Sequence, residues 1–232
     1  MNTIITGAGK GIGYSLVNKF LSNAKPNDCI FGLSRSIERL KDLNYNGIKI
    51  IPIKCDITNQ KEVENAITTI SNNCDNVDFL INNAGFLVNK PFNEILNADI
   101  DQIFNTNFKG PLNLIQKLFP LLNSSKKAHI VNISSMGGFQ GAAKFAGLSA
   151  YSSSKAALNC LTECLAVEFQ STSIKINALC LGAVETEMLS KAFPDFKASI
   201  NAEEMAQFIY LFTHENHHYM NGKVIPVSLS TP

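Results

Sequence analysis

Seven short apolar runs alternate with longer amphipathic stretches along the 232-residue chain, and this alternation constrains its fold more than any other feature. The runs cover residues 3–6, 29–33, 48–53, 77–85, 128–135, 174–182 and 223–229. Between them, segments such as 12–23 and 61–73 repeat apolar residues every three or four positions, which predicts helices. Strand and helix alternating in this way imply right-handed crossovers and a parallel sheet with helices on both faces. We therefore predict an α/β fold, a doubly wound sandwich around a mostly parallel seven-stranded sheet.

The length and composition favour one domain that spans residues 1–232. Hydrophobic residues make up 45% of the chain and charged residues 17%, which is enough apolar material for a buried core. No segment rich in proline, serine or charge separates two halves, and no internal repeat is present.

Charge and hydropathy argue against two classes of partner. The formal net charge is +1 and the lysines are scattered, so no basic stripe follows a nucleic acid backbone. No apolar run reaches the roughly 20 residues of a membrane helix, and the first residues lack the pattern of a signal peptide. We expect a cytoplasmic protein that binds neither nucleic acid nor membranes.

The cysteines and histidines form no convincing metal site. The six cysteines include no C-x-x-C pair, so we expect buried or partly buried free thiols. Cys160 and Cys164 share a helix face but have no further ligands nearby. His214, His217 and His218 have a spacing that can gather imidazoles, yet no carboxylate or cysteine completes the set, and we expect an exposed loop there.

A glycine-rich turn follows the first predicted strand. Residues 6–13 read "TGAGKGIG", and a predicted helix begins directly after them. Such a turn lets the backbone approach a pyrophosphate, while the helix N-terminus supplies free N–H groups. The spacing differs from both the common dinucleotide fingerprint and the P-loop. Glycines that only shape a tight turn are the alternative interpretation.

The end of the second predicted strand favours NADP(H) over NAD. An acidic residue at this place would bind a free ribose 2′-hydroxyl, but the sequence here is "FGLSRS". Arg35, with Lys10 as a second cation, could neutralise a 2′-phosphate instead. A solvated surface arginine is the alternative.

A tyrosine and a lysine lie four residues apart in "YSSSK", residues 151–155, and would share one helical face. This pair is common by chance. It is accompanied, in order along the chain, by "TGAGKGIG", "NNAG" (82–85), "NTNFKG" (105–110) and "IVNISS" (130–135). With these five motifs the chain resembles the short-chain dehydrogenase/reductase family over nearly its whole length, which implies a Rossmann-type fold.

The resemblance implies a catalytic group of four residues. Tyr151 would be the general acid in carbonyl reduction or the base in alcohol oxidation. Lys155 would hold the nicotinamide ribose and lower the pKa of Tyr151, which ordinarily lies near ~10. Ser135, with Ser134 as its rival, would hydrogen-bond the substrate oxygen, and Asn107 would hold a water of the proton relay.

The resemblance also implies a cofactor site along the ends of the strands. Its candidate residues are Gly7, Gly9, Lys10, Gly11, Ile12, Gly13, Ser34, Arg35, Asp56, Ile57, Asn83, Ala84, Gly85, Tyr151, Lys155, Gly182, Val184 and Thr186.

Three features depart from the family pattern. Leu181 replaces the usual proline before Gly182, the segment 135–151 is long, and the C-terminal residues 224–232 are atypical. The apolar residues expected at the pocket favour a substrate with an apolar portion, although core packing also explains several of them. They are Phe139, Phe145, Leu148, Met188, Phe193 and Phe196.

The function that these observations favour is an NADP-dependent reductase of a ketone, an aldehyde or a 3-oxoacyl thioester. A sugar or cyclitol dehydrogenase and a catalytically silent nucleotide-sensing protein are the alternatives. Family members commonly associate through helices that would here contain residues 99–119 and 151–169, so we expect a homodimer or homotetramer.

Overall fold

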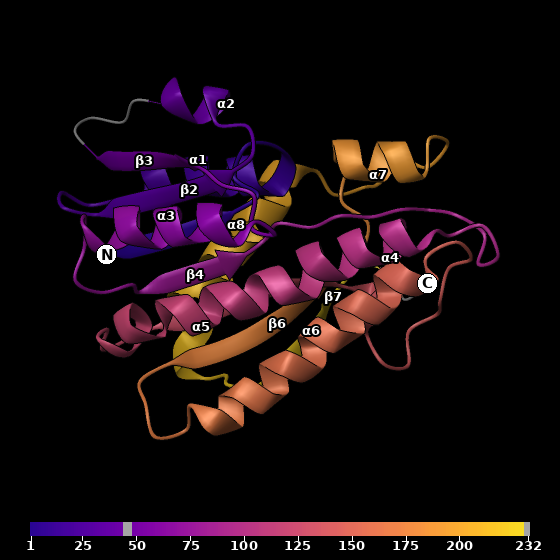
Figure 1. The fold of residues 1–232 in the computed structure, drawn as a ribbon. Coiled ribbons are helices and arrows are strands. Elements are labelled where there is room, and N and C mark those ends of the chain that lie inside the picture. The colour runs from indigo at the N-terminus through magenta and orange to yellow at the C-terminus, as the bar shows by residue number, and fades with distance from the viewer. Residues whose placement is uncertain (44–47, 230–232) are drawn as a thin grey trace.

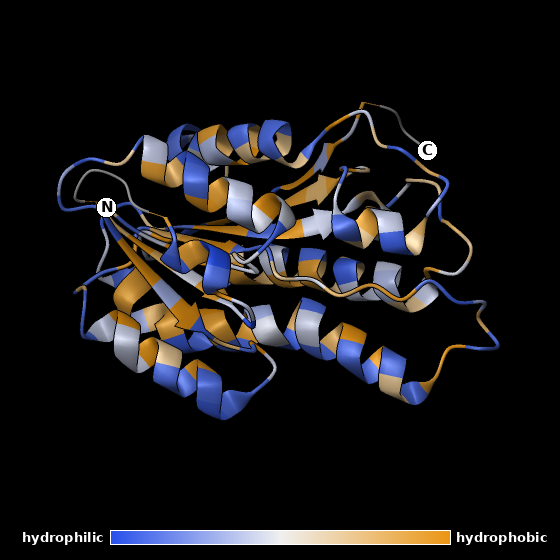
Figure 2. Ribbon diagram, turned by 90° about the horizontal axis from the view of Figure 1, so that it is seen from above, coloured by the Kyte–Doolittle hydropathy of each residue, from blue (hydrophilic) through white to orange (hydrophobic). Residues whose placement is uncertain are grey.

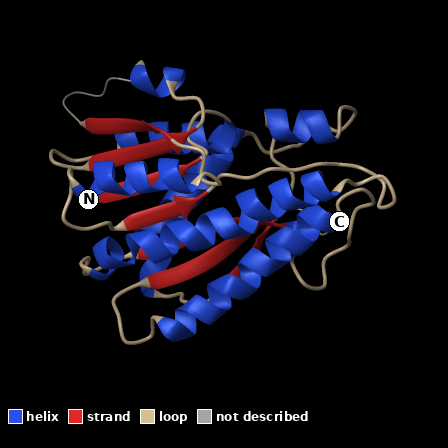
Figure 3. Cartoon of the chain, in the orientation of Figure 1, coloured by secondary structure: helices blue, strands red, loops and turns tan. Residues whose placement is uncertain are grey.

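The computed structural model describes residues 1–43 and 48–229, and the last three residues of the atypical C-terminal segment lie outside this range. Its seven strands pair in one fully parallel sheet, in the order β3-β2-β1-β4-β5-β6-β7 (Figure 3). The strands are β1 (Asn2–Thr6), β2 (Cys29–Ser34), β3 (Lys49–Lys54), β4 (Phe79–Asn82), β5 (His129–Ser135), β6 (Lys175–Leu181) and β7 (Val224–Val227). The predicted fold class is confirmed.

Helices cover both faces of the sheet (Figure 1). They are α1 (Gly11–Ser22), α2 (Glu38–Lys41), α3 (Gln60–Ser71), α4 (Asn97–Phe104), α5 (Gly110–Asn123), α6 (Ser149–Glu168), α7 (Glu187–Ala192) and α8 (Ala202–Glu215). A π-helical turn, Asn105–Lys109, joins α4 to α5, and Met136–Gly138 and Asn216–His218 are 3₁₀ turns. One core cluster packs α3, α5 and α6 on the sheet, and another packs α1 and α8 on the opposite face. The apolar strands lie between these two layers in Figure 2.

The strand order reverses between β1 and β4, because the chain first builds outward through β2 and β3 and then returns beside β1. Ligands of open α/β sheets bind at the carboxyl ends of the strands near such a reversal. The predicted run 77–85 ends as a strand at Asn82, and residues 83–85 leave the sheet at this point. The glycine turn and "NNAG" thus lie side by side at the reversal.

Two of the six cysteines do not follow the prediction. Cys29, Cys55 and Cys180 are buried and Cys74 is half-buried, but Cys160 and Cys164 are exposed. Each exposed cysteine lies two positions after a buried residue of α6, which is about 200° around the helix and therefore faces away from the sheet.

The histidine segment is helical rather than a loop. His214 lies in the last turn of α8, where its ring stacks on Tyr210 at 5.6 Å between centroids, and His218 belongs to a 3₁₀ turn. Among the described residues, no three His, Cys, Asp or Glu side chains are grouped so that they could hold a metal ion. Within residues 1–43 and 48–229, no helix is long and apolar enough to cross a bilayer.

Candidate active site

The turn after β1 requires glycine at two positions. Gly7 and Gly11 have φ angles of 66° and 53°, in the left-handed region that favours glycine. Both line a cavity of about 660 Å³, as do Lys10 and Ile12. The other two predicted glycines do not line it: a Cβ on Gly9 would lie 2.6 Å from Ser34 Oγ, and one on Gly13 would meet the Gly7 carbonyl. Because they lack a side chain, Gly9 and Gly13 let the turn pack closely against Ser34 and against the Gly7 carbonyl.

Asn83 ties this turn to the end of β4. Its backbone N–H donates to Thr6 Oγ1 at 3.0 Å, and its side-chain Nδ2 donates to the Thr6 carbonyl at 2.9 Å. Ala84 N–H also donates to Thr6 Oγ1 at 3.0 Å. Asn83, Ala84 and Gly85 all line the cavity, so the loop after β4 borders it at the strand reversal.

Two cations predicted to bind a 2′-phosphate line the cavity but differ in their surroundings. Arg35, next to Ser34 at the end of β2, is exposed and makes no ion pair with the described residues. Lys10 Nζ lies 3.0 Å from Glu187 Oε2 at the start of α7. Hydrogen bonding from Lys10 holds the pKa of Glu187 below its usual value. Lys10 is therefore paired, and Arg35 is the freer cation.

Asp56 and Ile57 follow β3 and line the same part of the cavity. Asp56 Oδ1 accepts hydrogen bonds from Thr58 N–H at 2.9 Å and from Thr58 Oγ1 at 2.8 Å. These bonds orient the carboxylate, while Ile57 is buried against the glycine at the start of α5.

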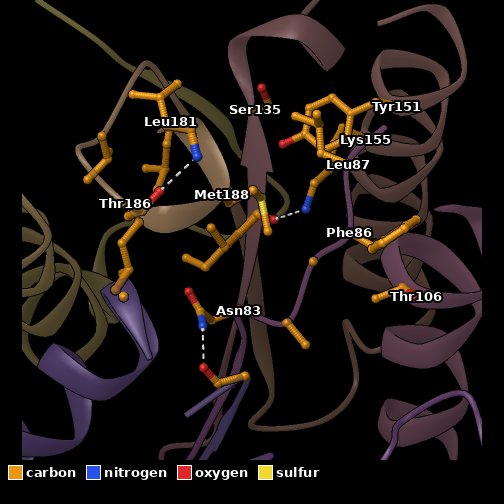
Figure 4. Close-up of a pocket in the computed structure, with 18 of the residues that line it drawn as sticks. Asn83, Phe86, Leu87, Thr106, Ser135, Tyr151, Lys155, Leu181, Thr186 and Met188 are labelled. Atoms are coloured by element: carbon orange, nitrogen blue, oxygen red, sulfur yellow. Dashed lines mark hydrogen bonds between the residues drawn. The ribbon is translucent and has the colours of Figure 1, made fainter. Parts of the chain in front are cut away.

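Ser135 and Tyr151 meet where β5 ends and α6 begins (Figure 4). The Ser135 hydroxyl opposes the effect of burial, which raises the pKa of Tyr151. Ser135 Oγ also accepts from Gly137 N–H at 3.2 Å. Ser134 Oγ instead donates to the Lys155 carbonyl at 3.2 Å and is buried. Of the two serines, Ser135 is the one beside the tyrosine.

Lys155 is buried beneath this pair. Its Nζ donates to the Ile133 carbonyl at 2.8 Å and lies 5.9 Å from the centre of the Tyr151 ring. Burial lowers the pKa of Lys155 to about 8. Burial raises the pKa of Tyr151, and the lowering of this pKa by Lys155 that the resemblance implies stays a prediction.

Asn107 lies in the π-helical turn and does not line the cavity. Its Oδ1 accepts from Phe86 N–H at 2.8 Å, and its Nδ2 donates to the Phe86 carbonyl at 2.9 Å and to Ser154 Oγ at 3.0 Å. Both amide hydrogens are thus used within the protein. A Cβ on Gly85 would lie 3.7 Å from both Asn107 Oδ1 and Lys155 Nζ. Asn107 therefore braces the loop beneath which Lys155 lies.

The segment after β6 closes the other side of the cavity. Leu181, Gly182, Val184 and Thr186 line it, and Gly182 N–H donates to the Val227 carbonyl at 2.9 Å. Thr186 caps α7 by accepting from Leu189 N–H at 3.3 Å. The backbone turn that proline would stiffen is held here by β7.

The cavity has two ends of different chemistry. Lys10, Arg35 and Asp56, from the loops after β1, β2 and β3, form its charged end. The apolar end comes from segments after β5 and β6 and consists of Phe145, Leu148, Met188, Leu189, Phe193 and Phe196. The expectation for Phe139 was wrong, since it packs on Met136, Ala142 and Cys180 instead of lining the cavity.

Sequence reasoning missed several lining residues, notably Phe86, Leu87, Thr106 and Glu187. Phe86 and Leu87 directly follow "NNAG", so extending that motif along its loop would have found them. Glu187 had no such signal, because its partner Lys10 is distant in sequence.

Comparison with known proteins shows the family of the chain. A family model described as short chain dehydrogenase matches residues 1–197. Two tropinone reductase homologues of Arabidopsis thaliana are each 30% identical, over 82% and 85% of this chain. The matches cover 59% and 73% of the plant proteins, so the chain spans less than two thirds of the first of them.

Among solved structures, an NADPH-bound carbonyl reductase from chicken fatty liver has a similar fold. Its TM-score is 0.86 at 23% identity, with 97% of this chain and 95% of that chain covered. The chain belongs to the short chain dehydrogenase family, and it is an NAD(P)-dependent oxidoreductase.

Proposed function

We propose that this short chain dehydrogenase is an NADP-dependent reductase that converts a ketone, an aldehyde or a 3-oxoacyl thioester to the alcohol. The observation that carries the proposal is the meeting of Ser135 and Tyr151 above Lys155, in one cavity with a glycine turn and an exposed arginine. The tropinone reductase homologues and the carbonyl reductase, by their names, support a carbonyl substrate.

The lining of the cavity fits a dinucleotide. Gly7, Gly11 and Gly85 face it without side chains, so a pyrophosphate can approach the backbone closely. In our proposal Arg35 binds the 2′-phosphate, Asp56 and Ile57 border the adenine, and Asn83 borders the adenosine ribose. Gly182, Val184 and Thr186 border the nicotinamide. When bound, NADPH supplies the hydride that reduces the carbonyl carbon.

The side chains of the site move and hold the proton. Tyr151 donates its phenolic proton to the carbonyl oxygen, and Ser135 donates a hydrogen bond to the same oxygen. Burial raises the pKa of Tyr151, which keeps the phenol protonated at neutral pH, the state that reduction requires. Lys155 holds the nicotinamide ribose, and Asn107 holds the loop around Gly85 in place.

The alternatives are less well supported. A sugar or cyclitol substrate would need polar side chains around its hydroxyls, whereas one end of the cavity is formed by apolar residues. A silent nucleotide sensor would not need Ser135 and Tyr151 side by side. The cytoplasmic location stays a prediction.

The test is to follow NADPH absorbance with a panel of ketones, aldehydes and 3-oxoacyl thioesters, and NADP⁺ reduction with alcohols and cyclitols. We expect turnover of carbonyl compounds with NADPH and slower turnover with NADH. Binding of NADPH without turnover of any compound would favour the sensor, and turnover of cyclitols alone would favour the dehydrogenase.

A further inference from the structure

The apolar end of the cavity exposes large hydrophobic side chains to its opening. Phe145, Phe196 and Met188 are 45%, 53% and 37% exposed, and all three line the cavity. Phe145 comes from the segment before α6, and the other two come from α7 and the segment after it. Clustered exposed apolar groups mark a binding surface more often than singly scattered ones do.

The charged side chains of the cavity are not free to pair with a substrate at this end. The ionised side chains that line the described cavity are Lys10, Arg35, Asp56, Lys155 and Glu187. Three of these lie at the charged end, and Glu187 is paired with Lys10. Lys155 donates to the Ile133 carbonyl and, in the proposed function, holds the nicotinamide ribose. A carboxylate or ammonium beside the carbonyl would therefore lose its hydration without gaining a partner, which is costly.

The segments that carry the two phenylalanines are braced against a common loop. Asn89 Nδ2 donates to the Ala192 carbonyl at the end of α7 at 2.9 Å. The neighbouring Lys90 N–H donates to the Gly147 carbonyl at 3.1 Å. Phe145 and Phe196 thus flank the opening from segments held by the same loop, residues 89–90.

We propose, building on the proposed function, that the substrate is an uncharged carbonyl compound whose apolar chain or ring lies against Phe145 and Phe196. These two residues set the preference for chain length, and the uncharged lining excludes compounds that are ionised near the carbonyl.

The experiment compares straight-chain methyl ketones of increasing length, and two keto compounds that differ only in ending as a carboxylate or as its methyl ester. We expect kcat/KM with NADPH to rise by up to roughly fourfold per methylene until the chain passes the opening. The ester should be turned over at least roughly tenfold better than the acid.

Phe145→Ala and Phe196→Ala should each reduce this dependence on chain length, with a larger loss for long ketones than for short ones. Phe92→Ala is the matched control, because Phe92 is 80% exposed and lies outside the cavity, and it should keep the wild-type dependence. Circular dichroism and NADPH affinity show whether each variant is folded.

A binding measurement makes the result independent of turnover. Calorimetric titration of the same ketones into the NADP⁺-saturated protein should give dissociation constants that fall with chain length. Dissociation constants that do not change with chain length, or a preference for the carboxylate over the ester, overturn the proposed substrate class. If small ketones are turned over in that case, the proposed function still stands. A length-dependent binding series without turnover upholds the substrate class and contradicts the proposed reductase.

Discussion

At the scale of single residues, Tyr151 and Lys155 show how burial sets proton chemistry. Burial disfavours the charged form of each group, so it raises the pKa of the phenol and lowers the pKa of the ammonium. The Ser135 hydroxyl acts against the shift of Tyr151. Burial therefore keeps the phenol of Tyr151 protonated near neutral pH, whereas it brings the pKa of the Lys155 ammonium closer to neutral pH.

Tyr151→Phe should lower kcat by roughly 10²–10⁴, because it removes the proton donor and little else. NADPH affinity, measured by fluorescence titration, should stay near the wild-type value. A variant with near-normal activity would show that the proton comes from another group.

Arg35→Ala should weaken NADPH binding by roughly tenfold and leave NADH binding nearly unchanged, since a charge-assisted bond to the 2′-phosphate is lost. Arg39→Ala is the matched control, because Arg39 is the other arginine of the chain. Its guanidinium carbon Cζ lies 3.9 Å from the centre of the Tyr14 ring, on which it stacks. Equal weakening of both cofactors by Arg35→Ala would contradict the assignment.

Lys155→Met should stabilise the free protein while lowering activity. The pKa of Lys155 falls from 10.5 to about 8 on folding, so below pH 8 the folded state carries the full cost of a buried charge. Between these pKa values only the unfolded state binds the proton, so wild-type stability should rise with pH through this window. The gain of the variant, on the order of 3 kcal/mol at neutral pH, should vanish above about pH 10.5.

Chemical denaturation of both proteins across this pH range measures the difference. The exposed Lys61→Met serves as a control and should follow the wild type at every pH. A constant difference in stability between Lys155→Met and wild type would show that folding does not lower the pKa of Lys155.

At the scale of elements, the glycine turn and α7 meet across the cavity. Lys10 and Glu187 form an ion pair, and a Cβ on Gly11 would lie 3.5 Å from Thr186 Cγ2. The side chains of the ion pair are 58% and 63% exposed, so the pair contributes little to stability. A phosphate that approaches Lys10 must compete with the Glu187 carboxylate.

Glu187→Gln should therefore tighten NADPH binding by roughly two- to fivefold, the scale of one exposed ion pair. The tightening should shrink as salt is added, and it should be absent in a Lys10→Met background. A double-mutant cycle, built from dissociation constants that calorimetry measures, tests this. An equal effect of Glu187→Gln with and without Lys10 would contradict the competition.

At the scale of the whole molecule, α6 connects the site to a surface. Its buried side carries Ser154 and Lys155, and its outward side carries Ala156, Cys160 and Val167. Val167 is 65% exposed. This face also carries the exposed Glu163, but its other side chains are small or apolar and suit close contact between helices of two subunits.

We expect a homodimer or homotetramer, measured as molar mass by light scattering. Ala156→Arg or Val167→Lys should lower the mass by placing a charge on the contact face, whereas Asn65→Lys on the exposed side of α3 should not. A monomeric wild type, or a mass that neither α6 variant changes, would exclude this interface.

The sequence by itself determined the seven strands, their parallel pairing and the region of the site, because apolar periodicity and the order of the motifs are local properties. It did not determine which side chain faces the cavity. Ser135 rather than Ser134 lies beside Tyr151, because successive residues of a strand point to opposite faces. Gly9 and Gly13 do not line the cavity, because Gly9 packs on Ser34 and Gly13 on the Gly7 carbonyl. Only tertiary structure joined Lys10 to Glu187 across 177 positions and directed Lys155 to the Ile133 carbonyl, since packing between distant segments decides which partner a charge meets.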